Sequence, residues 1–393
     1  MLLAIYFAAA LVAFLRYDMS TEMANADLSR TLPVSLSILM TAYRIFLLVT
    51  LGAAMFLPLH FRVSRPDLAR ILRVCWIMSV ILSVCGILDY FGVANLAFSY
   101  RRDAGYKHVS VMGFHRGPLG MISVYGLFLT VACYFIHRGG SVRKAVPLLL
   151  PLQFASLVLS WSRVALISLA CASLALLCFP GVRHRGRLVV GLGIAAGLVM
   201  LGLGLDDEIY QRLFFFSTGY TDTSLDTRAQ TWQSLVDVIW NDPSILLAGC
   251  GFGNFNYYYN SGMGAVSLEV AHNNYLHVLS ECGVAGLAFF LTWLAVVLRW
   301  ALRWQRRMTD PVVRAVHLCF TGILISAAAS CLSQESLTPA NATVPLVLHF
   351  FLLHGVWLAW SRTEMENPPA GGADFRAAPR PAGSHDARRT GNV

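Results

Sequence analysis

The chain has 393 residues, of which 56% are hydrophobic and only 13% are charged. A soluble protein normally carries about a quarter charged residues, so a soluble globular protein is excluded, and the continuous apolar blocks are typical of segments that face lipid. The formal net charge is +9, but the basic residues cluster in short loops between the apolar blocks, which argues against a nucleic-acid partner.

The apolar blocks predict an all-α integral membrane fold of about ten membrane-spanning helices, since about 17–25 apolar residues cross the hydrocarbon. The predicted spans are 1–16, 33–59, 69–91, 117–137, 144–160, 162–180, 187–205, 283–300, 312–332 and 344–361. The first block lacks the basic n-region of a signal peptide, so it is expected to be a short span of a longer natural N-terminus. The apolar run from Ala145 to Phe179 is too long for one span and is predicted to turn at Ser160–Arg163.

The short basic loops predict the orientation of the spans, because arginine and lysine favour the cytoplasmic side. Four such loops alternate with the others and contain Arg62, Arg65 and Arg70; Arg138, Arg143 and Lys144; Arg183, Arg185 and Arg187; and Arg303, Arg306, Arg307 and Arg314. The tail 362–393 joins them and has a composition typical of disorder. The large loop 206–282 is then expected on the opposite side, which in a bacterial inner membrane faces the periplasm.

The large loop is predicted to contain two helices. Asp226 or Thr227 could cap the first, Asn241-Asp242-Pro243 would end it, and its apolar stripe is Trp232, Leu235, Val236 and Ile239. Gly249, Gly251 and Gly253 superficially resemble a phosphate-binding loop, but a turn is favoured because no parallel strand precedes them. The second helix is expected to begin near His272 and to run into the span at Gly283.

The cysteines give no metal signal. Seven lie in apolar blocks, where they act as small hydrophobes, and there is no Cys-x-x-Cys pair. Only Cys250 and Cys282 lie in or beside the large loop, where they could either form a disulfide or remain free.

Several cations on the outward side are not explained by topology, and they are the first candidates for a site. They are Arg101, Arg102, Lys107, Arg116, Arg163 and Arg228. Individually they could snorkel to headgroups, and Arg228 could pair with Asp222 or Asp226. Together they indicate an anionic ligand, and the planar guanidinium suits phosphate oxygens.

The segment from Ala271 to Gly283 contains two histidines. At the mouth of a membrane helix, His272 could act as a general base near neutral pH, while either histidine could instead be a structural hydrogen bonder. Helical spacing predicts His272, Tyr275, Leu276 and Leu279 on one face and Asn273, His277 and Glu281 on another. The second stripe could be a relay or a weak metal site, although two ligands without a third are a poor metal signal.

Three elements in this order resemble the O-antigen ligase and polymerase family of bacterial membrane glycosyltransferases. They are Ser160-Trp-Ser-Arg163; Thr227-Arg-Ala-Gln-Thr-Trp232 followed by Gly249-Cys-Gly-Phe-Gly; and Ala271-His-Asn-Asn-Tyr-Leu with Glu281-Cys-Gly283. The resemblance is best over residues 145–300 and divides the chain into N-terminal helices (1–144), this core, C-terminal helices (301–361) and the tail.

The resemblance implies transfer of a glycan from undecaprenyl diphosphate, at the periplasmic face, to a hydroxyl of lipid A-core or of a second lipid-linked glycan. It also implies the helical fold of lipid-linked glycosyltransferases (GT-C-like), with no metal or other cofactor. By position, Arg163 and Arg228 would hold the diphosphate and His272 would activate the acceptor. Substrate contacts would come from Arg116 (often asparagine in relatives), Arg101, Arg102, Gln230, Trp232, Asn273, Tyr275 and Glu281.

Within this resemblance, O-antigen ligation is favoured over polymerisation. Two further classes of membrane protein stay open. One is a transporter or flippase, which would normally show an internal repeat and ionisable residues inside spans. The second is a non-catalytic assembly scaffold, which would tolerate loss of the outward arginines.

Overall fold

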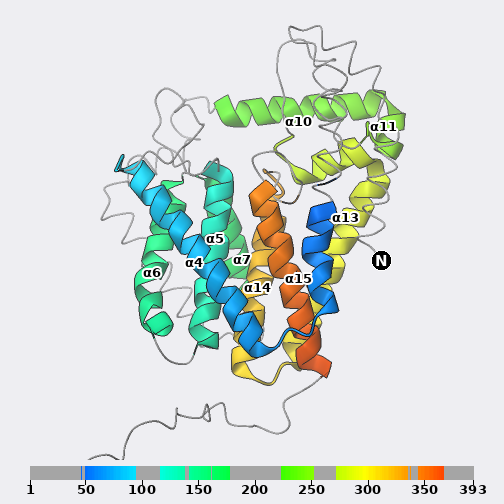
Figure 1. The fold of residues 1–393 in the computed structure, drawn as a ribbon. Coiled ribbons are helices and arrows are strands. Elements are labelled where there is room, and N and C mark those ends of the chain that lie inside the picture. Colours follow the sequence, from blue (N-terminus) through cyan, green and yellow to red (C-terminus); the bar gives the residue numbers. More distant parts are fainter. Residues whose placement is uncertain are drawn as a thin grey trace, which may run out of the picture.

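The computed structural model describes residues 46, 49–93, 116–137, 141–160, 162–177, 223–251, 271–334, 337 and 344–366. Every regular element in these ranges is a helix (Figure 1). The long helices of the bundle are α4 (Arg65–Tyr90), α5 (Arg116–Ile136), α6 (Ser141–Leu159), α7 (Arg163–Leu177), α13 (Asn274–Arg307), α14 (Pro311–Ser330) and α15 (Val344–Glu366). A short 3-10 helix, η1 (Leu57–His60), precedes α4.

Among the described residues, five helices are long and apolar enough to cross a membrane: α4, α5, α6, α13 and α14. They correspond to the predicted spans 69–91, 117–137, 144–160, 283–300 and 312–332. The predicted turn near Ser160 is confirmed, because α6 ends at Leu159 and α7 begins at Arg163. The predicted spans 1–16 and 187–205, and most of 33–59, lie outside the described residues.

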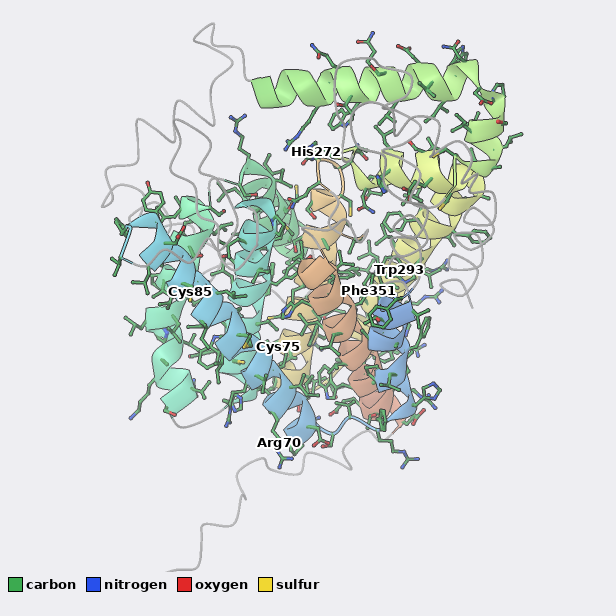
Figure 2. The ribbon with its side chains drawn as sticks, turned by 45° about the horizontal axis from the view of Figure 1, so that its top comes forward. Arg70, Cys75, Cys85, His272, Trp293 and Phe351 are labelled. Atoms are coloured by element: carbon green, nitrogen blue, oxygen red, sulfur yellow. The ribbon has the colours of Figure 1, made fainter. Side chains whose placement is uncertain are left out.

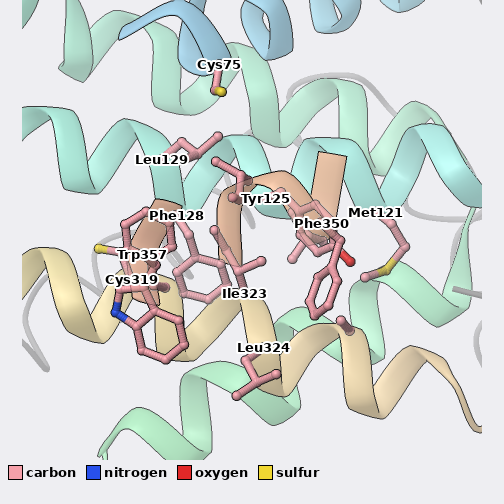
Figure 3. Packing of buried hydrophobic residues seen from close by; sticks show 14 of the residues in the cluster. Cys75, Met121, Tyr125, Phe128, Leu129, Cys319, Ile323, Leu324, Phe350 and Trp357 are labelled. Carbon is pink, nitrogen blue, oxygen red and sulfur yellow. The ribbon is translucent and has the colours of Figure 1, made fainter. Parts of the chain in front are cut away.

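The core of the bundle contains a cluster of aromatic rings from α5, α14 and α15. The Trp357 indole of α15 stacks on the Phe320 ring of α14, with ring centroids 5.8 Å apart, and Tyr125 of α5 packs against Phe350 at 6.2 Å (Figure 3). The spans of α5 and α14 are mostly buried, whereas less than half of each span of α4, α6 and α13 is buried. Apolar side chains exposed along a membrane-length helix are expected where it faces lipid.

The two ends of the bundle differ in the residues that they carry. Figure 2 shows His272 at the end that α10 crosses and Arg70 at the opposite end. At the Arg70 end, the Arg65 guanidinium pairs with Asp310 at 2.8 Å and with Glu364 at 2.6 Å, which ties together α4, α14 and α15. Residues of the predicted basic loops therefore gather at one end, and we call the other the α10 end.

Two helices of the large loop lie at the α10 end. Helix α10 (Thr223–Asn241) crosses the bundle, and α11 (Pro243–Ala248) follows it (Figure 1). The predicted start of α10 is wrong, because Asp226 and Thr227 lie inside the helix rather than at its cap. Its predicted end is confirmed: the Asp242 side chain accepts a hydrogen bond from the Ser244 amide and caps α11.

The predicted apolar stripe of α10 is correct only in part. Leu235 and Ile239 are buried, but Val236 is 52% exposed. Val236 follows Leu235 directly, so the helix turns it away from the surface that holds Leu235, and the buried positions repeat at the four-residue spacing of one face.

Candidate functional site

His272 lies just outside the start of α13, in a backbone conformation that is uncommon for a side chain of its size. Its φ is +50°, the one positive φ of a non-glycine residue in the described ranges. The predicted helical faces are therefore wrong for His272 and Asn273, because α13 begins at Asn274 and Asn273 is its N-cap. A left-handed backbone conformation is strained at a non-glycine residue, and such residues cluster at functional sites, where the surrounding contacts hold them in place.

The Asn273 side chain fixes the segment from both sides. Its Oδ1 accepts hydrogen bonds from the amides of Tyr275 and Leu276, at 3.0 and 3.1 Å. Its Nδ2 donates to the carbonyl oxygen of Leu332 at 3.0 Å. An asparagine N-cap satisfies amides that the first helical turn leaves unpaired, and here the same side chain also holds the chain after α14.

Two further bonds join the start of α13 to α14. The Asn274 amide donates to the Cys331 carbonyl at 2.8 Å, and the Tyr275 hydroxyl donates to the Ala328 carbonyl at 2.9 Å. The position of His272 is thus set by a short stretch that is pinned to the end of α14. The side-chain polar groups of Asn273 and Tyr275 are thus hydrogen-bonded to backbone carbonyls and amides.

Helix α10 reaches the same segment through Trp232. Its indole Nε1 donates a hydrogen bond of 2.8 Å to the carbonyl oxygen of Ala271, the residue before His272. Arg228 lies one helical turn before Trp232 and is half-buried, and Gln230 is exposed. Residues four apart share a face of a helix, so Arg228 and Trp232 lie on the side of α10 that meets the His272 segment.

A sharp kink at Gly283 divides α13 into a part that lies across the end of the bundle and a part that runs along it (Figure 1). Gly249 and Gly283 both have positive φ. A Cβ on Gly249 would collide with the Glu281 carbonyl, and a Cβ on Gly283 would collide with the Leu247 carbonyl. The Cys250 amide donates to the Ser280 carbonyl at 2.8 Å. The prediction of a turn at Gly249 is confirmed, and no disulfide joins Cys250 to Cys282.

His277 and Glu281 lie on the first part of α13 and pair with each other. The His277 Nε2 and the Glu281 Oε1 are 3.5 Å apart, and both side chains are largely buried. The predicted shared face of these two residues is confirmed. Within the described part of the chain, no group of three or more His, Cys, Asp or Glu side chains could hold a metal ion.

Arg163 begins α7 at the α10 end, next to the start of α5. The Ser162 Oγ accepts a hydrogen bond from the Ala165 amide at 3.3 Å, and the Ser160 Oγ would lie 2.8 Å from a Cβ on Gly120. Gly120 is one turn after Arg116, which begins α5. The backbones of Arg116 and Arg163 therefore flank a close contact between two helix starts. Arg101, Arg102 and Lys107 lie outside the described residues.

These contacts bring the first turns of α5, α7 and α13, the end of α14 and helix α10 to one end of the bundle. Arg163, Arg228 and His272 therefore lie at the same end of the bundle. Guanidinium groups suit phosphate oxygens, and an imidazole can accept a proton near neutral pH.

Comparison with known proteins agrees with the resemblance seen in the sequence. Residues 148–291 match the family of O-antigen ligases. The matched region includes Arg163, Arg228 and His272 but not Arg116, and it covers less than half of the chain. None of the curated proteins matches the chain.

Proposed function

We propose that this protein transfers a glycan from undecaprenyl diphosphate to an acceptor hydroxyl at the periplasmic face of the bacterial inner membrane, most directly to lipid A-core as an O-antigen ligase. The observation that supports this proposal best is that the starts of α5, α7 and α13 lie together with helix α10 at the α10 end. Arg163 begins α7, Arg228 lies on α10 and His272 precedes α13, and all three fall within the region that matches the O-antigen ligase family.

In this proposal the acceptor oxygen attacks the anomeric carbon of the donor sugar. The bond between that carbon and the diphosphate oxygen breaks, and undecaprenyl diphosphate leaves with the bonding electrons. His272 takes the proton of the acceptor hydroxyl, as a general base must lie within hydrogen-bond reach of the proton that it removes. The strained backbone at His272 and the bonds on either side of it support a fixed imidazole.

Arg163 and Arg228 would neutralise the charge that develops on the leaving diphosphate. Preorganised cations aimed at developing charge commonly account for much of the rate enhancement of an enzyme. A lipid diphosphate is already a good leaving group, so the protein needs charge neutralisation and positioning rather than a bound nucleotide. This chemistry requires no metal ion, and transfer is expected to continue when a chelator is present.

The test is complementation of a ligase-deficient strain with variants whose membrane abundance is measured in parallel. Arg163→Ala, Arg228→Ala and His272→Ala are each expected to abolish glycan transfer at normal abundance. Arg163→Lys is also expected to fail, because an ammonium group cannot form paired contacts with phosphate oxygens. Arg70→Ala is the matched control, since Arg70 is 80% exposed at the opposite end. Full activity in all three alanine variants would refute the assigned roles.

Deletion of the gene separates a ligase from a polymerase. A ligase is expected to leave bare lipid A-core, with full-length polymer remaining on the carrier lipid. Single glycan units on the core would instead identify a polymerase. Accumulation of lipid-linked glycan on the cytoplasmic face would identify a flippase and refute both.

A further inference from the structure

Gln334 lies at the α10 end, beside the starts of α5 and α13, although no sequence pattern singles it out. Gln334 belongs to the short stretch after α14 and is only 9% exposed. Its carboxamide packs against the first turn of α5: a Cβ on Gly117 would lie 2.6 Å from Nε2 and 3.0 Å from Oε1. The residue before Gly117 is Arg116, so a neutral amide sits beside a cationic helix start.

The place of Gln334 is fixed by the same contacts that hold His272. On one side of it, the Leu332 carbonyl accepts from the Asn273 Nδ2 at 3.0 Å. On the other side, the Leu337 amide donates to the Asn274 Oδ1 at 3.3 Å. Gln334 therefore lies within a loop whose two arms are bonded to the residues that directly follow His272.

The carboxamide has no hydrogen bond to another residue in the described part of the chain. The amide is therefore left able to bond a ligand, at the end of the bundle that holds His272. A carboxamide both donates and accepts hydrogen bonds. A sugar hydroxyl also donates and accepts hydrogen bonds, so it matches the carboxamide. Phosphate oxygens only accept hydrogen bonds, and the arginine guanidinium groups suit them better.

We propose that Gln334 binds a hydroxyl of the donor sugar next to the diphosphate, and so helps to select and orient the glycan. This inference rests on the proposed function, since it needs a lipid-linked glycan at the α10 end. Gly117 has a defined part in it: the absence of a side chain there lets the amide lie directly against α5.

The first test is Gln334→Leu, which keeps approximate size and removes both hydrogen-bonding groups. A site that bonds a substrate hydroxyl loses discrimination when the bond is removed, and we expect kcat/KM for glycan transfer to fall on the order of 10- to 100-fold. The matched control is Gln305→Leu, which removes a buried carboxamide near the opposite end of α13. Equal transfer by both variants at equal abundance would overturn the proposal.

The second test is a double-mutant cycle that does not depend on the stability of the leucine variant. Gly117→Ala should not weaken α5, because alanine is the better helix former, but its Cβ would displace the Gln334 amide. We expect it to reduce transfer at least 10-fold in the wild-type background, and to have no further effect in Gln334→Ala, where the shortened side chain leaves room. An equal loss in both backgrounds would refute the role of Gln334.

The proposed function itself is tested separately by Arg163→Ala in the same assay. Loss of transfer in Arg163→Ala with full transfer in Gln334→Leu would overturn only the inference about Gln334. Full transfer in both variants would overturn the proposed function together with it.

Discussion

Trp232 is bonded to the residue that immediately precedes His272. Its indole Nε1 donates to the Ala271 carbonyl oxygen at 2.8 Å, and that carbonyl belongs to the planar peptide group that leads into the His272 nitrogen. Helix α10 is therefore bonded to the backbone directly before His272. Trp232 is better described as a positioning residue than as a substrate contact, because its one polar group is already used.

The first prediction concerns this bond. Trp232→Phe keeps an aromatic ring but removes the donor, and a hydrogen bond contributes about 0.5–1.5 kcal/mol. We expect kcat for glycan transfer to fall about 3- to 10-fold, with a changed pH profile, since the imidazole of His272 would be held less firmly. Trp240→Phe on the same helix is the control, because Trp240 is 83% exposed. If the two variants behave alike, the bond has no part in positioning.

The five membrane-length helices of the described residues could be predicted from the sequence, because lipid imposes a length and an apolar composition on each span. The turn before Arg163 and the run of the second loop helix into the span at Gly283 follow from such patterns. The start of α10 at Thr223 could not, since Asp226 and Thr227 look like caps when the surrounding contacts are unknown.

Candidate site residues could be proposed one by one from the sequence, but their three-dimensional arrangement could not be predicted. Arginines in outward loops and a histidine before a span are visible as exceptions to composition rules. The bonds of Asn273 to Leu332, and the packing of Gln334 on Gly117, join residues that are far apart in the chain. Neither hydrophobic periodicity nor local propensity predicts such a long-range contact. A single glutamine in a loop therefore cannot be recognised from the sequence as a candidate site residue.

The second prediction distinguishes the two histidines. His277 is paired with Glu281 at 3.5 Å inside the fold, so we assign it a structural role. Removing one member of a largely buried polar pair commonly costs about 1–3 kcal/mol. His277→Gln is therefore expected to lower the Tm of the detergent-solubilised protein while the protein that remains folded keeps its kcat.

The matched variant is His277→Gln combined with Glu281→Gln, which replaces both members of the pair with neutral amides and should recover part of the lost Tm. His272→Ala is expected to show the reverse behaviour, with an unchanged Tm and no transfer. A His277→Gln protein of normal Tm without activity would show that His277, and not His272, carries the chemistry.

The third prediction tests the contact between the two glycine turns. Gly249→Ala and Gly283→Ala each add a Cβ that would collide with the backbone just before the other glycine. We expect each to destabilise the protein on the order of 3 kcal/mol or more, seen as a large loss of folded protein in the membrane. Gly92→Ala is a control with a similar φ of +72° but no atom within 4 Å of the added Cβ.

Gly92→Ala isolates the intrinsic cost of left-handed backbone, which is roughly 1–2 kcal/mol. The difference between it and the other two variants then measures the contact of the α11 end with the kink in α13. If all three variants lose the same amount of folded protein, the turns do not press on each other and the first part of α13 is not held by α11.

The fourth prediction concerns pH and the end of the bundle away from the candidate site. Burial by itself would raise the pKa of Asp310, but the Val312 amide and the Arg65 guanidinium outweigh it, and the pKa is lowered. A carboxyl with a lower pKa in the folded than in the unfolded state stabilises the fold at pH values above its unfolded pKa, about 3.9. That contribution is lost as the pH falls through the folded pKa.

Asp310→Asn removes the charge but can still cap α14, because asparagine is as good an N-cap as aspartate. We expect it to destabilise the fold at pH 7 by about 1–3 kcal/mol, and the Tm difference from the wild type to shrink below about pH 4. Glu366→Gln is the control: its pair with Arg362 is exposed and such pairs contribute about 0–1 kcal/mol. A Tm difference that stayed constant down to pH 3 would mean that charge plays no part, and that Asp310 acts only as a cap.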